Sequence, residues 1–393
     1  MGTVLDYLKK YGDCSFKEMP MTEVDSLALC QLSYLKFDGM VPGLRDDRPS
    51  VELRSLVDHP DFEQLFADTR YEKVNRELFN NMLAGKRFGS LKLNCYVNII
   101  VQKWETQFSA VTFILDDGTV YVAYRGTDES IVGWKEDFNM AFLSPVPGQE
   151  MSVDYLNTAA SRIRGSFYVG GHSKGGNLAV YSAMNCRREV LERIVKIFSM
   201  DGPGFRPEVL EKCRFDLIAD RVVKILPHSS LVGMLFESNM NFQVVESKTF
   251  GLLQHDPYTW KVEDTHLVRA DALYERRKQM DNTLNEWILS LDEQQLRIFV
   301  DTLFQVISAS KADNLIDFTA EWRRSMNGIV AALKGIDEET AGILKKIVKS
   351  LFVIASTNRK KEAASRKEAT LNRLAARQKP AKQNRTKPSA RKA

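Results

Sequence analysis

A serine set among glycines is the residue of this chain best placed to do chemistry. Residues 167–176 read Phe-Tyr-Val-Gly-Gly-His-Ser-Lys-Gly-Gly, so Ser173 lies at the centre of a G-x-S-x-G pattern. Its first residues favour a strand, and residues 177–184 suit a helix. A turn between strand and helix that only small residues fit pushes the serine hydroxyl out above a sheet. The pattern therefore predicts that Ser173 is a nucleophile.

A serine hydroxyl is a weak nucleophile and needs a neighbouring base, usually a histidine. The chain has five histidines: His59, His172, His228, His255 and His266. In enzymes whose serine lies in such a strand-to-helix turn, the histidine follows the serine in the sequence and lies on a loop after a later strand. His255, within the loop-like stretch 254–260, is the predicted base, and His228 is the alternative. His172 is discounted because it lies inside the turn itself.

A carboxylate that orients the imidazole would complete the set. Asp201 ends a strand that follows the serine helix, at the carboxyl edge where ligands bind in open α/β sheets. It is the predicted acid. The competing interpretation is that Asp201 only caps the turn made by the Gly-Pro-Gly at 202–204. Asp256, next to the histidine, and Asp220, which precedes a strand, are less well placed.

Attack on a carbonyl also needs two backbone N–H donors for the oxygen that becomes negative. Lys174, directly after the serine and at the start of the predicted helix, would supply one. Residues 124–128 follow a strand and offer a bend, so Thr127 is predicted to supply the other. The alternative is that Gly126 and Thr127 only make a turn.

Strands alternate with helices around these residues. The predicted strands are 96–103, 108–115, 119–124, 167–172, 194–200 and 221–227, and the predicted helices are 23–35, 151–164, the segment from residue 176, and 207–214. An Asp-Asp-Gly turn at 116–118 predicts an antiparallel hairpin. The fold class is therefore α/β, with a mostly parallel sheet and helices on both faces.

The pattern changes after about residue 275. The sequence at 290–293, Ser-Leu-Asp-Glu, reads as a capping box before an apolar stripe on one helix face. The stripe consists of Leu296, Phe299, Val300, Leu303 and Phe304. It is predicted to pack against the sheet domain. The predicted domains are 1–275 for the sheet, 276–356 for a helical appendage and 357–393 for a tail.

Positive charge is concentrated in the tail. Residues 359–393 hold 13 Lys and Arg against two Asp and Glu, a net charge of +11, whereas residues 1–358 carry −7. Such a segment is attracted to polyanions, so an anionic membrane surface or non-specific nucleic acid is the expected partner. The alternative is a solubilising end without a dedicated partner.

Composition excludes several other classes. The chain is 44% hydrophobic and 27% charged, as in ordinary globular proteins. Its five cysteines are scattered and form no metal-binding pair, which favours a reducing compartment. The N-terminus does not read as a signal peptide, and no apolar run is long enough to span a membrane, so a cytoplasmic protein is expected. Cofactor motifs are absent, so no cofactor is predicted.

Several of these segments together resemble a known family. Residues 124–127 followed by 134–138 resemble the R-G-T…W…D-[FL] signature of class 3 (fungal-type) lipases, and 171–176 resemble their G-H-S-x-G-G elbow. The chain is more similar still to a bacterial branch of that superfamily, the DUF2974 or Mbeg1-like proteins. The matching segments, within residues 1–265, are Phe16–Leu35, 201–205, Pro227–Phe236 and 254–260.

The resemblance implies an α/β-hydrolase fold, with Ser173 as nucleophile, His255 as base, and Thr127 and Lys174 at the oxyanion hole. One place departs from the pattern. Class 3 lipases carry their acid just after the strand that corresponds to 221–227, where this chain has Pro-His-Ser-Ser and no carboxylate. Either Asp201 replaces that acid, or the enzyme works with Ser173 and His255 alone, or it is impaired.

The resulting prediction is a serine hydrolase that cleaves carboxylic esters, including lipid or lysolipid esters, through an acyl-enzyme on Ser173. The alternative is a catalytically weak or inactive binding or scaffold protein on a hydrolase fold. In that case the basic tail would contact an anionic membrane or nucleic acid.

Overall fold

The computed structural model describes most of residues 1–270. The described residues are 1–67, 71–101, 103, 106–127, 136, 140, 145–230, 232–236, 241–249 and 251–270, with 286–287, 290–292, 294–298, 300, 302, 340, 342–343 and 346. The predicted tail at 357–393 and most of the predicted appendage at 276–356 lie outside them. The domain limits and the partner of the tail therefore stay predictions.

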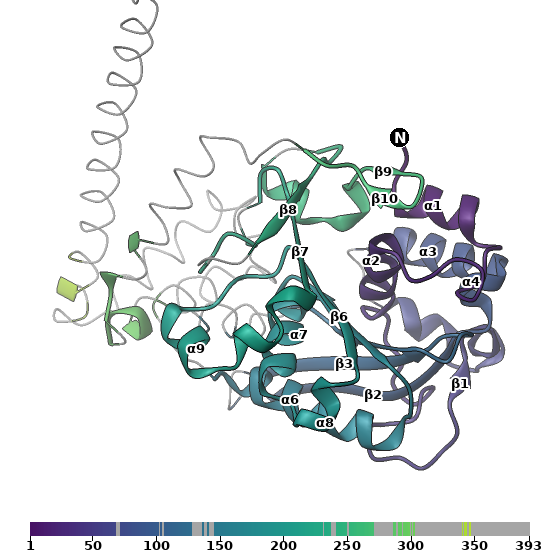
Figure 1. Ribbon diagram of the computed structural model, residues 1–393, viewed down its shortest axis with the longest axis horizontal. Coiled ribbons are helices and arrows are strands. Elements are labelled where there is room, and N and C mark those ends of the chain that lie inside the picture. Colours follow the sequence, from purple (N-terminus) through teal and green to yellow (C-terminus); the bar gives the residue numbers. More distant parts are fainter. Residues whose placement is uncertain are drawn as a thin grey trace, which may run out of the picture.

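The described elements form one large sheet with helices around it (Figure 1). The strands of this sheet are β1 (Val51–Glu52), β2 (Lys92–Val101), β3 (Thr106–Ile114), β4 (Val120–Tyr124), β5 (Phe167–His172), β6 (Ile194–Met200), β7 (Val222–Pro227) and β8 (Phe242–Val245). The α-helices are α1 (Val4–Tyr11), α2 (Glu23–Leu32), α3 (Glu72–Ala84), α4 (Lys86–Gly89), α6 (Pro147–Arg162), α7 (Lys174–Asn185), α8 (Arg188–Leu191) and α9 (Pro207–Lys212). A small second sheet pairs β9 (Val262–Glu263) with β10 (His266–Leu267).

The eight strands lie in chain order across the sheet. The strands from β1 to β4 pair antiparallel, and those from β4 to β8 pair parallel. The predicted hairpin is confirmed as β3 and β4, with Gly118 in its turn at a φ of 86°, a left-handed conformation that glycine adopts without strain. The carboxyl ends of β4 to β8 therefore share one edge, where the predicted site residues belong.

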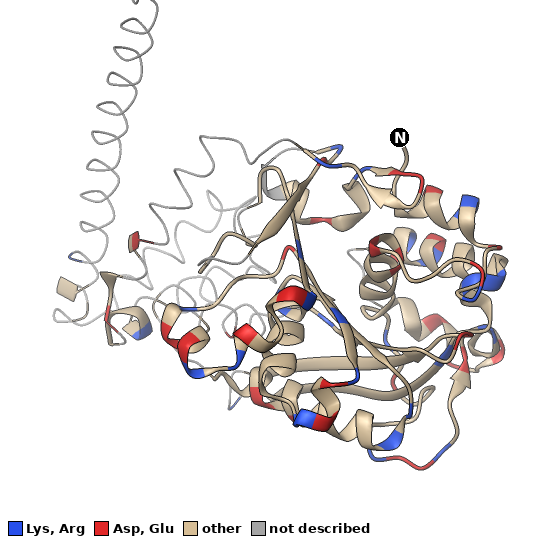
Figure 2. Ribbon diagram, viewed as in Figure 1, with Lys and Arg blue, Asp and Glu red and all other residues tan. Residues whose placement is uncertain are grey.

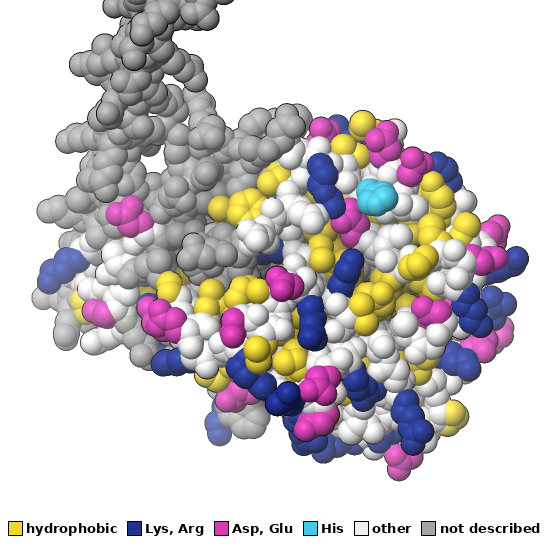
Figure 3. Space-filling model, viewed as in Figure 1, with side chains coloured by type: hydrophobic (Ala, Val, Ile, Leu, Met, Phe, Trp, Pro, Cys, Tyr) yellow, Lys and Arg dark blue, Asp and Glu magenta, His cyan; other side chains and the backbone are white. Residues whose placement is uncertain are grey.

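Helices cover both faces of the sheet, as the α/β class predicts (Figure 1). Side chains of β4 alternate between two apolar cores: Val122 and Tyr124 pack on the side of α6 and α7, and Tyr121 and Ala123 on the side of α1 to α4. Charged residues lie mainly on the surrounding helices and loops (Figure 2). Acidic, basic and apolar side chains mix on the face shown in Figure 3. The described surface on that face has no single sign of charge.

The N-terminal helices are tied together by a buried ion pair. Thr22 caps α2 and exchanges hydrogen bonds with Asp25, whose carboxylate also meets the Arg87 guanidinium at 2.6 Å, with both side chains fully buried. Arg87 donates further to the carbonyl oxygens of Cys14 and Met19. Removing one member of such a pair typically costs about 3–5 kcal/mol, so this pair holds α2, α4 and the segment after α1 together within the N-terminal layer, which consists of α1 to α4.

The capping box expected at 290–293 is wrong in register. The Ser290 hydroxyl donates to the carbonyl oxygen of Trp287 instead. The reciprocal pair is Asp292 with Gln295, each side chain accepting from the backbone N–H of the other at 2.8 and 3.1 Å. An aspartate caps a helix as well as a serine does, so Asp292 takes the capping role that was predicted for Ser290. Of the predicted stripe, Leu296 and Val300 are buried; Phe299, Leu303 and Phe304 lie outside the described residues.

In the described part of the chain, no helix combines the length and the apolar character that crossing a membrane requires.

Candidate active site

Ser173 lies in the turn between β5 and α7, and its backbone is strained. Its φ of 59° and ψ of −132° are unfavourable for a residue with a side chain. Neighbouring glycines make the turn possible: a methyl group on Gly171 would lie 2.6 Å from the Tyr124 carbonyl oxygen, and one on Gly175 would collide with the same oxygen. The chain can cross β4 this closely only because both positions lack a Cβ.

Asp201 lies beside Ser173 because their strands are neighbours. The Ser173 N–H donates to the carbonyl oxygen of Met200 at 2.9 Å, and the Asp201 N–H donates to that of Ile225 at 2.8 Å. Each residue therefore extends the ladder of parallel strands by one step. Asp201 also has a positive φ, 49°, and its side chain is fully buried. Two non-glycine residues in strained conformations at one sheet edge are typical of a functional site.

His255 connects the two. Its Nε2 lies 3.0 Å from the Ser173 hydroxyl, and its Nδ1 lies 2.6 Å from Oδ2 of Asp201. A carboxylate only accepts hydrogen bonds, so Nδ1 carries the proton and Nε2 is the acceptor that faces the serine. The His255 side chain remains 25% exposed, while Ser173 is 9% exposed. The predicted nucleophile, base and acid are therefore in hydrogen-bond contact with one another.

A serine supports the acid from the next strand. The Ser230 hydroxyl donates to Oδ1 of Asp201 at 2.5 Å and accepts the N–H of Gly233 at 3.0 Å. Both carboxylate oxygens of Asp201 are thus hydrogen-bonded, as a fully buried carboxylate requires. Ser230 lies directly after β7, where the lipase resemblance predicts an acid and where this chain has no carboxylate. Its hydroxyl instead donates a hydrogen bond to Asp201, which directly follows β6.

A buried glutamine joins the loop of His255 to the loop after β7. The Gln254 side chain accepts from the Ser229 N–H at 2.8 Å and donates to the Thr249 carbonyl oxygen at 2.6 Å. Its amide nitrogen also lies 3.0 Å from Nε2 of His228, the alternative base. His228 thus contacts the glutamine, whereas His255 is the histidine in contact with Ser173.

The predicted oxyanion region lies beside the serine. A methyl group on Gly126 would be 3.1 Å from Cβ of Ser173, so the turn that includes Thr127 lies against the nucleophile. Lys174 is the first residue of α7, and its N–H belongs to the positive end of that helix. The two backbone segments expected to supply donors are therefore on either side of Ser173.

The side chain of Lys174 has a second, buried function. Its ammonium group lies 2.9 Å from Oε2 of Glu136 and donates to Gln107, and both charged side chains are 1% exposed. Glu136 also accepts the backbone N–H groups of Gln107 and Gly148, each at 3.0 Å. The pair therefore joins the start of α7, which follows Ser173, to the starts of β3 and α6.

The two other carboxylates considered for the acid lie elsewhere. Asp256 caps the short helix η7 (Pro257–Thr259) through the N–H of Tyr258. Asp220 lies in η5 (Ala219–Arg221), before β7 and so at the opposite edge of the sheet from its carboxyl end. Sequence reasoning gave no role to four supporting residues: Glu136, Ser230, Gln254 and Tyr34, whose hydroxyl contacts His172. All four lie in segments that carry the family resemblance, which was the available signal, but the resemblance does not say what each side chain contacts.

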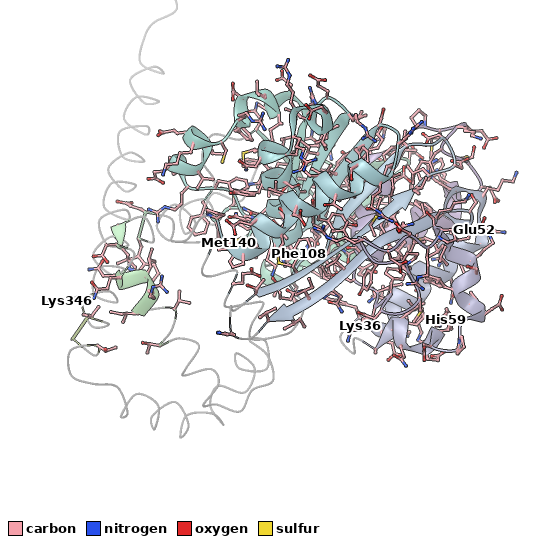
Figure 4. All side chains as sticks on the ribbon, turned by 90° about the horizontal axis from the view of Figure 1, so that it is seen from below. Lys36, Glu52, His59, Phe108, Met140 and Lys346 are labelled. Atoms are coloured by element: carbon pink, nitrogen blue, oxygen red, sulfur yellow. The ribbon has the colours of Figure 1, made fainter. Side chains whose placement is uncertain are left out.

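A shallow apolar cavity of about 460 Å³ lies between the β2–β3 pair and α6. Its lining includes Val97, Phe108 and Met151, but none of Ser173, Asp201 and His255. Figure 4 shows Phe108 and Glu52 at opposite ends of the long strands of this pair. No group of three or more His, Cys, Asp or Glu side chains in the described part of the chain is arranged to hold a metal ion.

Comparison with known proteins gives a family and distant structural likenesses. A search of curated proteins finds no match. Among solved structures, the crystal structure of M37 lipase is similar at 15% sequence identity and a TM-score of 0.33, covering 55% of this chain and 70% of that one. A likeness of this degree says nothing about the activity of this chain.

The family model of Mbeg1-like proteins matches residues 82–305. This range begins later than the expected match over residues 1–265, and it extends into the predicted helical appendage. Since it covers more than half of the 393 residues, the chain belongs to the Mbeg1-like family.

Proposed function

We propose that the protein is a serine hydrolase that cleaves carboxylic esters. One observation carries the proposal: His255 lies 3.0 Å from the Ser173 hydroxyl on one side and 2.6 Å from the buried Asp201 carboxylate on the other. A histidine held in this tautomer can take the proton of the serine, which an isolated serine cannot lose readily. The strained backbone of Ser173, which holds its side chain in the turn, supports the same role.

The reaction has two halves. Oγ of Ser173 attacks the acyl carbon while its proton passes to Nε2 of His255, and the carbonyl oxygen takes the negative charge. The C–O bond to the alcohol then breaks, and the alcohol leaves with the proton from His255. In the second half, a water loses its proton to His255 and attacks the acyl-enzyme, which releases the carboxylic acid and restores Ser173. Asp201 stabilises the positive charge that His255 carries between these steps.

The oxyanion is the next charge to stabilise. We assign its donors to the backbone N–H groups of Lys174 and Thr127, because α7 begins at Lys174 and the Gly126 turn lies against Ser173. Losing one such donor typically lowers kcat by about two to three orders of magnitude. The buried Lys174–Glu136 pair supports this geometry, since it fixes the side chain of the residue whose N–H donates.

The proposed substrates are esters with an apolar acyl group, and one residue close to the base in the sequence supports this choice. Leu253 lies two residues before His255 on the short helix η6 (Gly251–His255) and is 69% exposed. An exposed leucine beside the base favours lipid or lysolipid esters over small polar ones. Hydrolysis of p-nitrophenyl esters of increasing chain length tests this: the proposal expects kcat/KM to rise with length, and the shortest ester as the best substrate would contradict it.

The competing function is an inactive binding or scaffold protein that acts through its basic tail. The reason to consider this function is that no carboxylate follows residues 221–227. The contact between Asp201 and His255 argues against an inactive protein, because a carboxylate from the neighbouring strand reaches the imidazole.

Covalent labelling with a fluorophosphonate separates the two functions. We expect the wild type to be labelled, Ser173→Ala to be unlabelled, and Asp201→Asn to react about 10⁴-fold more slowly, as loss of the acid does in serine proteases. His255→Ala removes the base, so its labelling rate should fall at least as far as that of Asp201→Asn. The matched controls are His266→Ala, an exposed histidine, and Asp220→Asn, a carboxylate at the opposite sheet edge. A folded wild type that takes no label would favour the binding protein.

A further inference from the structure

The histidine within the Ser173 turn contacts the catalytic loop. His172 is buried, and its Nε2 lies 2.8 Å from the backbone carbonyl oxygen of His255. Its Nδ1 lies 3.1 Å from the hydroxyl of Tyr34, just after α2. Three segments that are distant in sequence therefore meet at one imidazole ring.

The proton positions in this chain of contacts follow from the partners. A carbonyl oxygen can only accept, so Nε2 of His172 carries a proton and donates to His255. In a neutral imidazole Nδ1 is then the acceptor, and the Tyr34 hydroxyl is the donor. Hydrogen bonds thus run in one direction, from Tyr34 to His172 to the backbone of His255. Tyr34 selects the tautomer that His172 needs to hold the loop.

The backbone of His255 needs such a partner. His255 ends the short helix η6, and the last carbonyl groups of a helix have no partner within it. The rings of His172 and His255 also pack together, with centroids 4.6 Å apart and planes inclined at 36°. The base is thereby held on three sides: by Asp201 at Nδ1, by the ring of His172, and at its own carbonyl oxygen.

The Tyr34 hydroxyl also touches the predicted oxyanion turn. A methyl group on Gly126 would collide with this hydroxyl and would lie 2.6 Å from the carbonyl oxygen of His172. Tyr34 therefore lies between the Gly126 turn and His172, which in turn contacts the loop of His255. A displacement of Tyr34 would change the packing of all three segments.

Other residues of the N-terminal layer hold the same loop. The hydroxyl of Tyr258, three residues after His255, donates to Asn75 of α3 at 2.7 Å. Burial raises the pKa of Tyr258 well above that of a free phenol, so this hydroxyl keeps its proton. Gly2 pairs with Val262 by two backbone hydrogen bonds. Tyr34, Asn75 and Gly2 all precede residue 82, where the family match begins.

We propose that Tyr34 and His172 form a positioning pair that holds the catalytic loop, and that the N-terminal layer is consequently part of the catalytic unit. The proposal rests on the proposed function, in which His255 is the base. Neither residue contacts the reacting atoms in this scheme. Both act on the rate by keeping Nε2 of His255 aimed at Ser173.

Two substitutions of His172 separate positioning from packing. Glutamine places an amide N–H near the position of Nε2 and can still donate to His255, whereas asparagine is too short and reaches only the position of Nδ1. Tyr34→Phe removes the other hydrogen bond. The matched control is Tyr11→Phe, since the Tyr11 hydroxyl also makes a 3.1 Å bond, to Asp264, away from the loop.

The measurement is the rate constant of fluorophosphonate labelling, with kcat and KM for a p-nitrophenyl ester and the melting temperature of each variant. We expect labelling to slow about 100-fold in His172→Asn, where a buried carbonyl loses its donor, and about 10-fold in Tyr34→Phe. His172→Gln should recover to within about 5-fold of wild type. KM should be unchanged throughout. Equal losses in His172→Gln and His172→Asn, or a Tyr34→Phe that labels like Tyr11→Phe, would overturn the pair while leaving the proposed function intact.

A second readout does not depend on turnover. The proton on Nδ1 of His255, in its 2.6 Å bond to Asp201, should give a downfield proton NMR resonance. We expect this resonance in the wild type and Tyr11→Phe, and its displacement or loss in His172→Asn. If the wild type takes no label, the proposed function fails, and this resonance alone decides: a change in His172→Asn supports the positioning pair, and an unchanged resonance refutes it.

Discussion

The two sides of the candidate site are held in place by different means. Ser173 is positioned by backbone packing, because Gly171 and Gly175 lie against the Tyr124 carbonyl with no space for a side chain. His255 is positioned by side-chain hydrogen bonds: its ring donates to Asp201, and its backbone carbonyl oxygen accepts from His172. The turn of Ser173 is rigid because its backbone packs with no space for additional atoms. The loop of His255 is rigid because the ring and the carbonyl oxygen of His255 are both hydrogen-bonded.

This difference predicts how each side fails. A close backbone contact cannot relax by moving one side chain, so an added methyl group either distorts the turn or unfolds the domain. A hydrogen-bonded loop can lose one bond and keep the others. We therefore expect abrupt losses on the serine side and graded losses on the histidine side. The following substitutions test that contrast.

Gly175→Ala should have the largest effect. The new methyl group would collide with the Tyr124 carbonyl oxygen and lie 2.9 Å from its carbon, and backbone atoms cannot rotate away. We expect a destabilisation of about 3 kcal/mol or more and complete loss of labelling, measured by denaturant melts and fluorophosphonate. Gly43→Ala is the control, since its methyl group would have its nearest neighbour 3.8 Å away. A labelled, stable Gly175→Ala would remove the contrast.

Gln254→Leu should have an intermediate effect. It leaves the Ser229 N–H and the Thr249 carbonyl without the amide that pairs them, at about 1–3 kcal/mol for each buried group. We expect partial loss of stability and labelling slowed by about 10- to 100-fold. Gln31→Leu is a matched control, because the amide nitrogen of Gln31 is buried without a hydrogen-bond partner among the described residues. Should both variants label equally, Gln254 would have no positioning role.

Ser230→Ala should have the smallest effect. Asp201 loses one hydrogen bond but keeps its contact with His255. We therefore expect labelling to slow by about 3- to 10-fold with little change in melting temperature. Ser182→Ala, which removes a buried hydroxyl bonded within α7, is the control for lost packing. If the labelling rate falls as far in Ser230→Ala as in Asp201→Asn, Asp201 depends fully on its hydrogen bond from Ser230, and the two residues function as a unit.

The sequence predicted the parts of this site that carry a local pattern. Glycine spacing identifies Ser173, and loop position identifies His255, because each depends on a few neighbouring residues. Asp201 is the predicted acid, but the sequence alone does not separate this role from that of a turn-capping aspartate, which has the same sequence context. The structure brings it to His255 through the pairing of β5 with β6, which no local pattern encodes.

The supporting residues could not be predicted for a related reason. Tyr34 and His172 are 138 positions apart, and Ser230 and Asp201 are 29 apart. Tyrosine, serine and glutamine are common types whose roles depend on what the fold places beside them. Among the elements, the main strands and α7 were predicted close to their limits, whereas α3 and the short β8 were missed. Strand β8 has four residues, too few for a clear period.

The long separations in this site have a consequence during synthesis. The residues of the serine turn have all been synthesised once residue 176 is added. The proposed base of Ser173, His255, lies 82 residues further along the chain than Ser173. Until that loop docks on His172 and Asp201, Ser173 has an ordinary hydroxyl with little reactivity. A nascent or prematurely ended chain would therefore carry the turn without the activity. Under the proposed function, Ser173 therefore becomes reactive only after the loop of His255 has docked, and an unfinished chain does not hydrolyse esters.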